Sequence, residues 1–202
     1  PGKLGMSGEH VWDAHLAGVL ALHPQGVTLP KALPDWIRRN KVALKGPVTT
    51  PIAEGITSVN VGLRKALDLY ANVRPVYRLP GVKTRFDQVD LVIVRENTED
   101  LYCGAGGFMH KGTPHEVATQ MAIYTRRGCE RCIRYAFEYT RKRNNPKGKK
   151  LTLVAKTNVL TTGHDLWWRT YKEVATEYPD IEADYNHVDA CCMWIVKNPE
   201  YY

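Results

Sequence analysis

The sequence predicts an α/β fold with a sheet that is at least partly parallel. Branched apolar runs without alternation occur at Leu91–Val94 and at 151–155, and such runs are typical of strands covered on both faces. Apolar residues recur at helical spacing over about 127–144 and 166–178. Because strands and helices alternate along the chain, we expect helices packed against a sheet.

The N-terminal third predicts two helices with a strand between them. Residues 1–27 show no clear element, and Leu33–Asn40 predicts a short helix that leads into a strand at Lys41–Leu44. Residues 58–71 predict the second helix, because their apolar residues fall on one face. That face is formed by Val59, Leu63, Ala66, Leu67 and Tyr70.

Glycines interrupt the pattern after the strand at Leu91–Val94. Gly104, Gly106, Gly107 and Gly112 indicate loops, and residues 115–125 are expected to include strands.

Five cysteines, an odd number, do not indicate a secreted disulfide framework. Cys129 and Cys132 have the spacing of zinc ligands, with His187, Cys191 and Cys192 as a conceivable second half. Against this, both thiols lie on one helical stripe with Ile133, Ala136, Phe137 and Thr140. We therefore expect them to face a core.

The net charge of +7 comes largely from a basic run at 141–150. Such a run either binds nucleic acid or forms a solvated helix end and loop. Aromatic residues for base stacking are absent from the run, which favours the second reading and no nucleic-acid partner. No apolar stretch is long enough to span a bilayer and no signal peptide is visible, so we expect no membrane partner and a cytoplasmic location.

Several polar residues fall at predicted element ends. Arg95 ends an apolar strand and Tyr102 follows seven residues later, which places a cation and a phenol at a sheet rim. Ser58 is a favoured helix N-cap, and Asn60 and Arg64 lie four residues apart on one helix face. Together with Arg74, just past that helix, the arginines are either structural ion-pair partners or receptors for a compact polyanion.

Six motifs in one order resemble the isocitrate/isopropylmalate dehydrogenases, the β-decarboxylating dehydrogenases. The resemblance is closest to isocitrate dehydrogenase and covers about 28–200. The motifs are Lys45-Gly46-Pro47 with Thr49-Thr50-Pro51, Ser58-Val59-Asn60, Leu63-Arg64-Lys65, Tyr70 to Pro75, Arg95 to Glu99, and Lys156-Thr157-Asn158 with Val188-Asp189-Ala190.

The resemblance implies a reaction and a set of site residues. The reaction is the oxidative decarboxylation of isocitrate to 2-oxoglutarate with NAD or NADP and with Mg²⁺ or Mn²⁺. Tyr102 and Lys156 match the catalytic acid/base pair. Arg64, Arg74 and Arg95 match the substrate arginines, with Ser58 and Asn60 at the carboxylate that distinguishes isocitrate. Thr50 matches a position near the nicotinamide, and Asp189 matches a metal ligand.

Ser58 and Asn60 favour isocitrate, because isopropylmalate dehydrogenases usually carry bulkier or apolar residues there. Isopropylmalate, homoisocitrate and tartrate dehydrogenases remain alternatives, as does a non-catalytic regulatory subunit.

The resemblance also implies a homodimer and an isopropylmalate dehydrogenase-like fold of two lobes with mixed sheets. Its residues matching Lys156 and Asp189 reach the partner's site. We expect 1–69 to form part of a large α/β domain and 70–202 a small α/β domain, with a dimer clasp at about 100–128. The large domain is expected to be incomplete and the chain truncated at both ends. We find neither a glycine-rich opening segment nor two further metal-binding aspartates.

Overall fold

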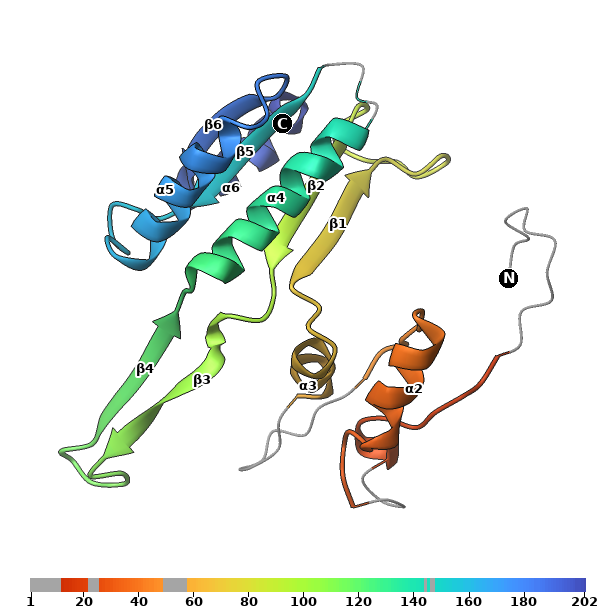
Figure 1. Cartoon of the computed structure of the whole chain (residues 1–202), viewed down its shortest axis with the longest axis vertical. Helices are drawn as coiled ribbons and strands as arrows, with labels where there is room; N and C mark the ends of the chain where they lie inside the picture. Colours follow the sequence, from red (N-terminus) through yellow and green to blue (C-terminus); the bar gives the residue numbers. More distant parts are fainter. Residues whose placement is uncertain (1–11, 22–25, 49–57, 144, 146–147) are drawn as a thin grey trace. The chain divides into compact units, whose positions relative to one another are not determined.

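The computed structural model describes residues 12–21, 26–48, 58–143, 145 and 148–202, and shows a mixed α/β structure (Figure 1). The chain divides into two compact units, Pro1–Leu67 and Asp68–Tyr202, and each is described by itself. The mixed α/β class predicted from the sequence is confirmed.

The first unit contains helices α2 (Ala32–Asn40) and α3 (Val59–Ala66). The prediction of a strand at Lys41–Leu44 is wrong. Lys41 adopts a left-handed conformation with φ of 65°, and its N–H bonds to the Ile37 carbonyl, so that it ends α2. The described residues that follow it have no regular structure and no strand to pair with.

The second unit contains three two-stranded sheets. Strands β1 (Ala71–Tyr77) and β2 (Asp90–Glu96) are antiparallel, as are β3 (Asp100–Met109) and β4 (Val117–Ile123). Strands β5 (Lys150–Ala155) and β6 (Glu182–His187) are parallel, in register from Lys150 opposite Glu182 to Ala155 opposite His187. The expected partly parallel pairing is therefore found in β5 and β6.

Two segments differ from the sequence prediction. The helix expected over 58–71 ends at Ala66, because Asp68 turns the chain with φ of 49°, and Arg74 consequently lies within β1. Gly104, Gly106 and Gly107, which were interpreted as loop residues, lie within β3. Gly112 lies in the turn after β3, as predicted. The register of the β3–β4 hairpin shifts between Asp100 and Ala105, and Gly104 has φ of 77° there, as in a β-bulge. A Cβ on Gly106 would lie 2.4 Å from the Thr119 carbonyl oxygen, so the close approach of the two strands requires a glycine.

Helix α4 (Arg126–Lys142) packs against α5 (Gly163–Ala175). The two helices run side by side in Figure 1. Phe137 of α4 is fully buried, with its ring stacked on Tyr178 at 4.8 Å and on Tyr171 at 5.5 Å. The core is completed by Cys129, Ile133, Val174 and Ile181. The helical stripe predicted for α4 is confirmed.

Helix α6 (Val188–Lys197) follows β6, and a 3₁₀ turn, η1 (Pro199–Tyr201), follows α6. The cysteines Cys129 and Cys132 are buried, as the stripe predicted, and burial raises the pKa of each thiol to about 12. Within the described ranges, no group of three or more His, Cys, Asp or Glu residues is placed to hold a metal ion.

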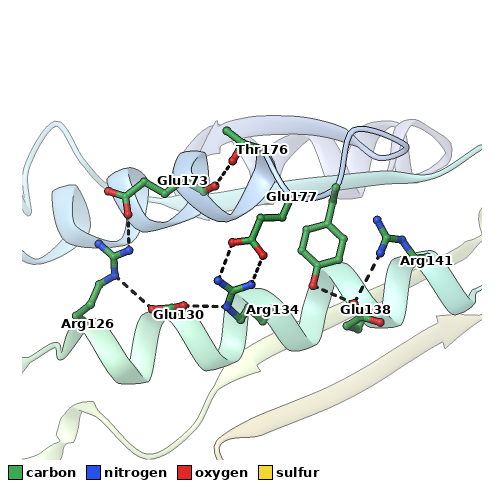
Figure 2. A network of polar contacts seen from close by, with 9 residues as sticks. Arg126, Glu130, Arg134, Glu138, Arg141, Glu173, Thr176 and Glu177 are labelled. Atoms are coloured by element: carbon green, nitrogen blue, oxygen red, sulfur yellow. Dashed lines mark hydrogen bonds and ion pairs between the residues drawn. The ribbon is translucent and has the colours of Figure 1, made fainter.

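Ion pairs line the outer side of the α4–α5 packing (Figure 2). Arg134 makes a fork-like pair with Glu177, with N–O distances of 2.7 and 2.8 Å, and also bonds to Glu130. Arg126 pairs with Glu173 and Glu130. These contacts fix the two helices in register on their exposed side.

Several described cations of the basic run at 141–150 also pair with carboxylates. Arg141 lies 2.5 Å and Lys149 3.5 Å from Asp180, and Lys150 lies 3.3 Å from Asp184. The paired cations therefore contribute to the packing of this unit. Over the part of the chain that is described, no helix is long and apolar enough to cross a membrane.

A cavity of about 440 Å³ lies between β2, α4 and β5. Its lining includes the branched residues of β2 and β5. The polar residues Asp100, Tyr124 and His164 also line it.

Candidate functional site

Arg95 and Tyr102 lie together, as their positions at the ends of neighbouring elements predicted. Arg95 ends β2, and Tyr102 is the third residue of β3. The Arg95 guanidinium donates to the Tyr102 hydroxyl at 3.4 Å and lies 5.8 Å from the centre of its ring. Both side chains are exposed, so a cation and a phenol are presented together to an incoming ligand.

Arg74 lies on the same face of the β1–β2 ribbon as Arg95. In the antiparallel register Asn72 is opposite Arg95, and Arg74 is opposite Ile93. Residues two apart on a strand share a face, so Arg74 and Arg95 are diagonal neighbours across the ribbon. The Asn72 side-chain oxygen accepts from Arg74 Nε at 3.3 Å, which directs the Arg74 guanidinium toward the residue opposite Arg95.

The two arginines have only neutral partners among the described residues. Arg74 bonds to an amide, and Arg95 bonds to an amide and a phenol. Several exposed arginines elsewhere also lack a carboxylate partner, so their joint position on one face is the informative feature. Two guanidinium groups held side by side without an acidic partner form a surface suited to carboxylates.

Asn97 orients Arg95 and was not singled out from the sequence. Its side chain is buried, with 5% exposed, and its Oδ1 accepts from Arg95 at 3.0 Å. Glu96 stabilises the same turn, since its carboxylate accepts from the backbone N–H groups of Thr98 and Glu99. Their position immediately after Arg95 is the only sequence signal for either residue.

Lys156 and Asp189 form a second pair. Lys156 follows β5 and Asp189 lies in the first turn of α6, so both stand at the carboxyl end of the parallel pair β5–β6. Their side chains are joined by an ion pair of 2.7 Å. The hydrogen bond from Lys156 lowers the pKa of the Asp189 carboxyl.

Ser58, Asn60 and Arg64 lie on α3 of the first unit. Ser58 is the N-cap residue of α3, as predicted, although its side chain makes no capping hydrogen bond. Asn60 Oδ1 is buried and has no partner among the described residues, whereas the great majority of buried polar atoms have one. Arg64 makes no ion pair with any described residue, so α3 carries a cation without a carboxylate partner there.

The cofactor and metal predictions are not matched by a complete set of residues. Thr50, predicted near the nicotinamide, lies outside the described residues. Asp189 offers one carboxylate, whereas Mg²⁺ takes about six oxygen ligands. No further carboxylate completes a metal site within the ranges described. Asp189 therefore stays a predicted metal ligand.

The structure thus forms three groups from the predicted residues. Arg74, Arg95 and Tyr102 are one group, Lys156 and Asp189 are the second, and the α3 residues are the third. No hydrogen bond or ion pair of the described residues joins the first two groups directly. The fold and these groups define an α/β protein with a cationic face suited to a carboxylate ligand.

Comparisons with known proteins identify the family. The family model described as isocitrate/isopropylmalate dehydrogenase matches residues 5–202. The chain belongs to this family, which is a family of oxidoreductases.

Relatives with both family names are similar to the chain. The 3-isopropylmalate dehydrogenase of Frankia casuarinae is 43% identical, over 90% of this chain and 54% of its own length. A mitochondrial isocitrate dehydrogenase [NAD] catalytic subunit 5 of Arabidopsis thaliana is 43% identical, over 93% of this chain and 48% of its own length. The chain therefore spans about half the length of these relatives.

A solved structure supports the same assignment. The crystal structure of isocitrate dehydrogenase from Methylococcus capsulatus superposes with a TM-score of 0.88 at 47% identity. The match covers 95% of this chain and 56% of that one. The predicted family and fold are thus confirmed. Because the similar proteins carry both family names, they do not decide between the two substrates.

Proposed function

We propose that this chain carries substrate-binding and acid/base residues for the oxidative decarboxylation of isocitrate to 2-oxoglutarate, with NAD or NADP as hydride acceptor. The observation that carries the proposal is the placement of Arg74, Arg95 and Tyr102. Two guanidinium groups share one face of the β1–β2 ribbon, with a phenol 3.4 Å from one of them.

In this proposal the arginines bind and orient the substrate. Guanidinium groups form paired hydrogen bonds with carboxylates, which fixes the direction of the bound acid as well as its position. The Asn97 side chain holds Arg95 in place, so little side-chain freedom is lost when the substrate binds.

Tyr102 and Lys156 supply the acid and base. Oxidation of the hydroxyl group requires that its proton be removed, and the enolate that remains after loss of carbon dioxide requires a proton. Lys156 Nζ and Tyr102 Oη are the groups assigned to these transfers. When bound, NAD or NADP accepts the hydride from the substrate carbon.

Ser58 and Asn60 support isocitrate as the substrate. The Ser58 hydroxyl and the Asn60 side-chain NH2 group can each donate to a third carboxylate. A branched alkyl chain would accept no hydrogen bond from either group. The alternative is 3-isopropylmalate, and it has at least as much support among the similar proteins, including the relative from Frankia casuarinae. Homoisocitrate and tartrate are further alternatives.

We propose that the chain acts as a homodimer with shared sites, joined through the β3–β4 hairpin. The hairpin packs mainly on itself, and every residue of β4 is exposed. Its large apolar side chains are more than 40% exposed, which is unusual for a surface that faces only water. They are Leu101, Phe108, Met109, Val117, Met121 and Ile123. We propose that a second copy of the hairpin covers these side chains. Arg95 and Tyr102 of one copy would then lie near Lys156 of the other.

A non-catalytic regulatory subunit is the alternative from a different class. Such a subunit has no chemical need for both Tyr102 and Lys156, and this chain holds both. Catalysis is therefore the proposal that accounts for more of the sequence.

The experiment offers isocitrate, 3-isopropylmalate, homoisocitrate and tartrate, each with NAD or NADP and Mn²⁺, and follows reduced nicotinamide by absorbance. Binding of each acid is measured in parallel by calorimetry. We expect isocitrate to give the highest kcat/KM, and Lys156→Met to lower kcat while KM changes little. Preference for another acid would overturn the interpretation of Ser58 and Asn60. Binding of acids without oxidation of any of them would favour the regulatory subunit.

A further inference from the structure

A chain of hydrogen bonds runs from the base of the β3–β4 hairpin to the backbone of Lys156. The Lys156 backbone N–H donates to His164 Nδ1 at 2.7 Å. His164 Nε2 lies 3.4 Å from the Tyr124 hydroxyl, and that hydroxyl donates to Asp100 Oδ1 at 2.9 Å. Asp100 is two residues before Tyr102 in β3. None of these three side chains was assigned a role above.

The directions of these hydrogen bonds fix one protonation state of His164. Because Nδ1 accepts from Lys156, it carries no proton, and the proton of the neutral ring is on Nε2. Nε2–H then donates to the Tyr124 oxygen, which leaves the Tyr124 proton for Asp100. Burial lowers the pKa of His164, which favours the neutral ring. Burial and the bond to Asp100 raise the pKa of Tyr124, which keeps its hydroxyl protonated as a donor.

The backbone of Lys156 is held on both sides by this arrangement. Its N–H bonds to the His164 ring, and its carbonyl accepts from the N–H groups of Val159 and Leu160. The Leu160 carbonyl in turn accepts from the His164 N–H at 3.0 Å. A closed loop of hydrogen bonds therefore connects Lys156 with the first turn of α5.

Two unusual backbone features support the same arrangement. A Cβ on Gly163 would lie 2.3 Å from the Tyr124 ring, so the ring reaches its place only over a glycine. Asp100 has φ of 60°, a conformation that non-glycine residues rarely adopt. Its carboxylate meets the Tyr124 hydroxyl from this conformation.

We propose that His164 is a positioning residue for Lys156, held in its tautomer and orientation by Tyr124 and Asp100. Asp100, Tyr124 and His164, here called the relay, join the strand that carries Tyr102 to the segment that carries Lys156. No hydrogen bond joins Tyr102 to Lys156 directly among the described residues. The geometric part of this inference concerns only the described residues, and its consequence for the rate rests on the proposed function.

The test compares His164→Phe with His164→Asn and Tyr124→Phe. Phenylalanine keeps a ring but accepts no hydrogen bond. Asparagine places an oxygen near the position of Nδ1 and so retains the acceptor for the Lys156 N–H. Tyr124→Phe keeps the ring on Gly163 and removes only the hydroxyl. His15→Phe is the control, since it also replaces a histidine that packs against an aromatic ring, that of Trp36 at 4.8 Å, in the first unit.

Amide hydrogen exchange at Lys156 is the direct readout. We expect exchange to accelerate by at least about tenfold in His164→Phe, because the N–H loses its partner, and to stay near the wild-type rate in His164→Asn and in the control. Nitrogen NMR should show the Nε2–H tautomer in the wild type, and a mixture of tautomers in Tyr124→Phe. Unchanged Lys156 exchange in His164→Phe, or an Nδ1–H tautomer in the wild type, would overturn the inference.

Kinetics separate this inference from the proposed function. Where the chain oxidises a hydroxy acid, kcat should fall about tenfold in His164→Phe with KM unchanged, and His164→Asn should restore most of it. Faster amide exchange at Lys156 in His164→Phe, together with an unchanged kcat, would refute the positioning role. Absence of oxidation in the wild type, with the exchange result as expected, would refute the proposed function and leave the relay intact.

Discussion

At the scale of single residues, the candidate arginines differ from other surface arginines in their hydrogen-bond partners. Arg134 and Arg141 pair with carboxylates on the outer side of α4, whereas Arg74 and Arg95 have neutral partners. Asn97 is buried, and its hydrogen bond from Arg95 offsets the cost of burying its side-chain oxygen. These two guanidinium groups have no carboxylate partner among the described residues, so they are the groups that a carboxylate ligand would bind.

Replacement of Arg95 by glutamine should weaken the binding of the hydroxy acid with little effect on folding. A hydrogen bond to a charged group contributes about 1.5–3 kcal/mol, and the site is partly exposed, so we expect KM to rise about tenfold. Steady-state kinetics or calorimetric titration measures the change. Arg127→Gln removes an exposed arginine of α4 and serves as the control. Equal binding by Arg95→Gln and the wild type would contradict a role in substrate recognition.

The pKa of His164 gives a pH dependence of stability with a defined sign. Burial lowers this pKa in the folded state, and Asp100 opposes the shift. Between the lowered value and the ordinary value of about 6.5, the unfolded chain binds more protons, so the free energy of unfolding rises with pH. We expect stability to be highest above about pH 6.5 and to fall below it.

Urea unfolding of the wild type and His164→Phe at a series of pH values tests this dependence. The variant lacks the titrating group and should lose less stability over the same interval. Parallel curves for the two proteins would mean that His164 is not the group responsible.

At the scale of secondary-structure elements, the packing of α4 on α5 supports the strand ends that carry the site. Phe137 lies at its centre, between two tyrosine rings. Phe137→Ala should lower the free energy of unfolding by about 3–5 kcal/mol, since it removes a fully buried ring and leaves a cavity. Tyr77→Ala, at a ring that is 58% exposed, should change it by less than about 0.5 kcal/mol. Denaturant unfolding measures both, and similar losses in the two variants would contradict this location of the core.

Asp180 connects the chain after α5 to the basic end of α4. The hydrogen bond from Arg141 lowers the pKa of Asp180 from 3.8 to about 2. The carboxylate therefore stabilises the fold above about pH 3.8, and this contribution is lost as the pH falls toward about 2. Asp180→Asn should show a weaker loss of stability over that interval in thermal unfolding at low salt. An unchanged acid profile in the variant would show that the pair has no effect on folding.

The elements that were predicted have strong periodic patterns, and those that were missed do not. The α4 stripe and the β2 and β5 runs are read from apolar spacing alone. Strand β6 alternates polar residues with little apolar content, and β1 contains Pro75, which is tolerated where a strand edge is free. The β3 glycines read as loop residues because the bulge and the close strand pairing that require them become visible only in the folded hairpin.

The site shows a similar division. Arg74, Arg95, Tyr102 and Lys156 follow from motif resemblance and from positions near element ends. Tyr124 and His164 carry no such signal, because they are 40 residues apart and only the fold brings them together. The strand that was wrongly predicted at Lys41–Leu44 shows the same dependence on context, since a short apolar run forms a strand only beside a pairing partner.

At the scale of the whole molecule, the β3–β4 hairpin is the element whose apolar side chains stay exposed in a single copy. It exposes apolar side chains on a two-stranded ribbon, which is at best marginally stable in water by itself. A second copy would cover these side chains and bring Lys156 toward the partner's arginines. The proposed homodimer would therefore explain why no hydrogen bond joins Tyr102 and Lys156 among the described residues of one chain.

Substitution of Phe108 and Met121 by aspartate should separate the proposed dimer. Charges introduced at two exposed apolar positions of the hairpin oppose its burial against a second copy, while the core of the second unit is unaffected. Light scattering should report a dimer for the wild type and a monomer for the double variant, with unchanged α4–α5 stability. A wild type that is monomeric at all accessible concentrations would contradict the shared site.

NMR titration of the arginine side chains determines whether Arg74 and Arg95 recognise a hydroxy acid together. Isocitrate and 3-isopropylmalate are added separately while the guanidinium signals of both residues and the ring of Tyr102 are followed. We predict saturable shifts of all three groups with one dissociation constant, tighter for isocitrate, and loss of all three shifts in Arg95→Gln. Shifts that do not saturate, or that persist in Arg95→Gln, would contradict the site.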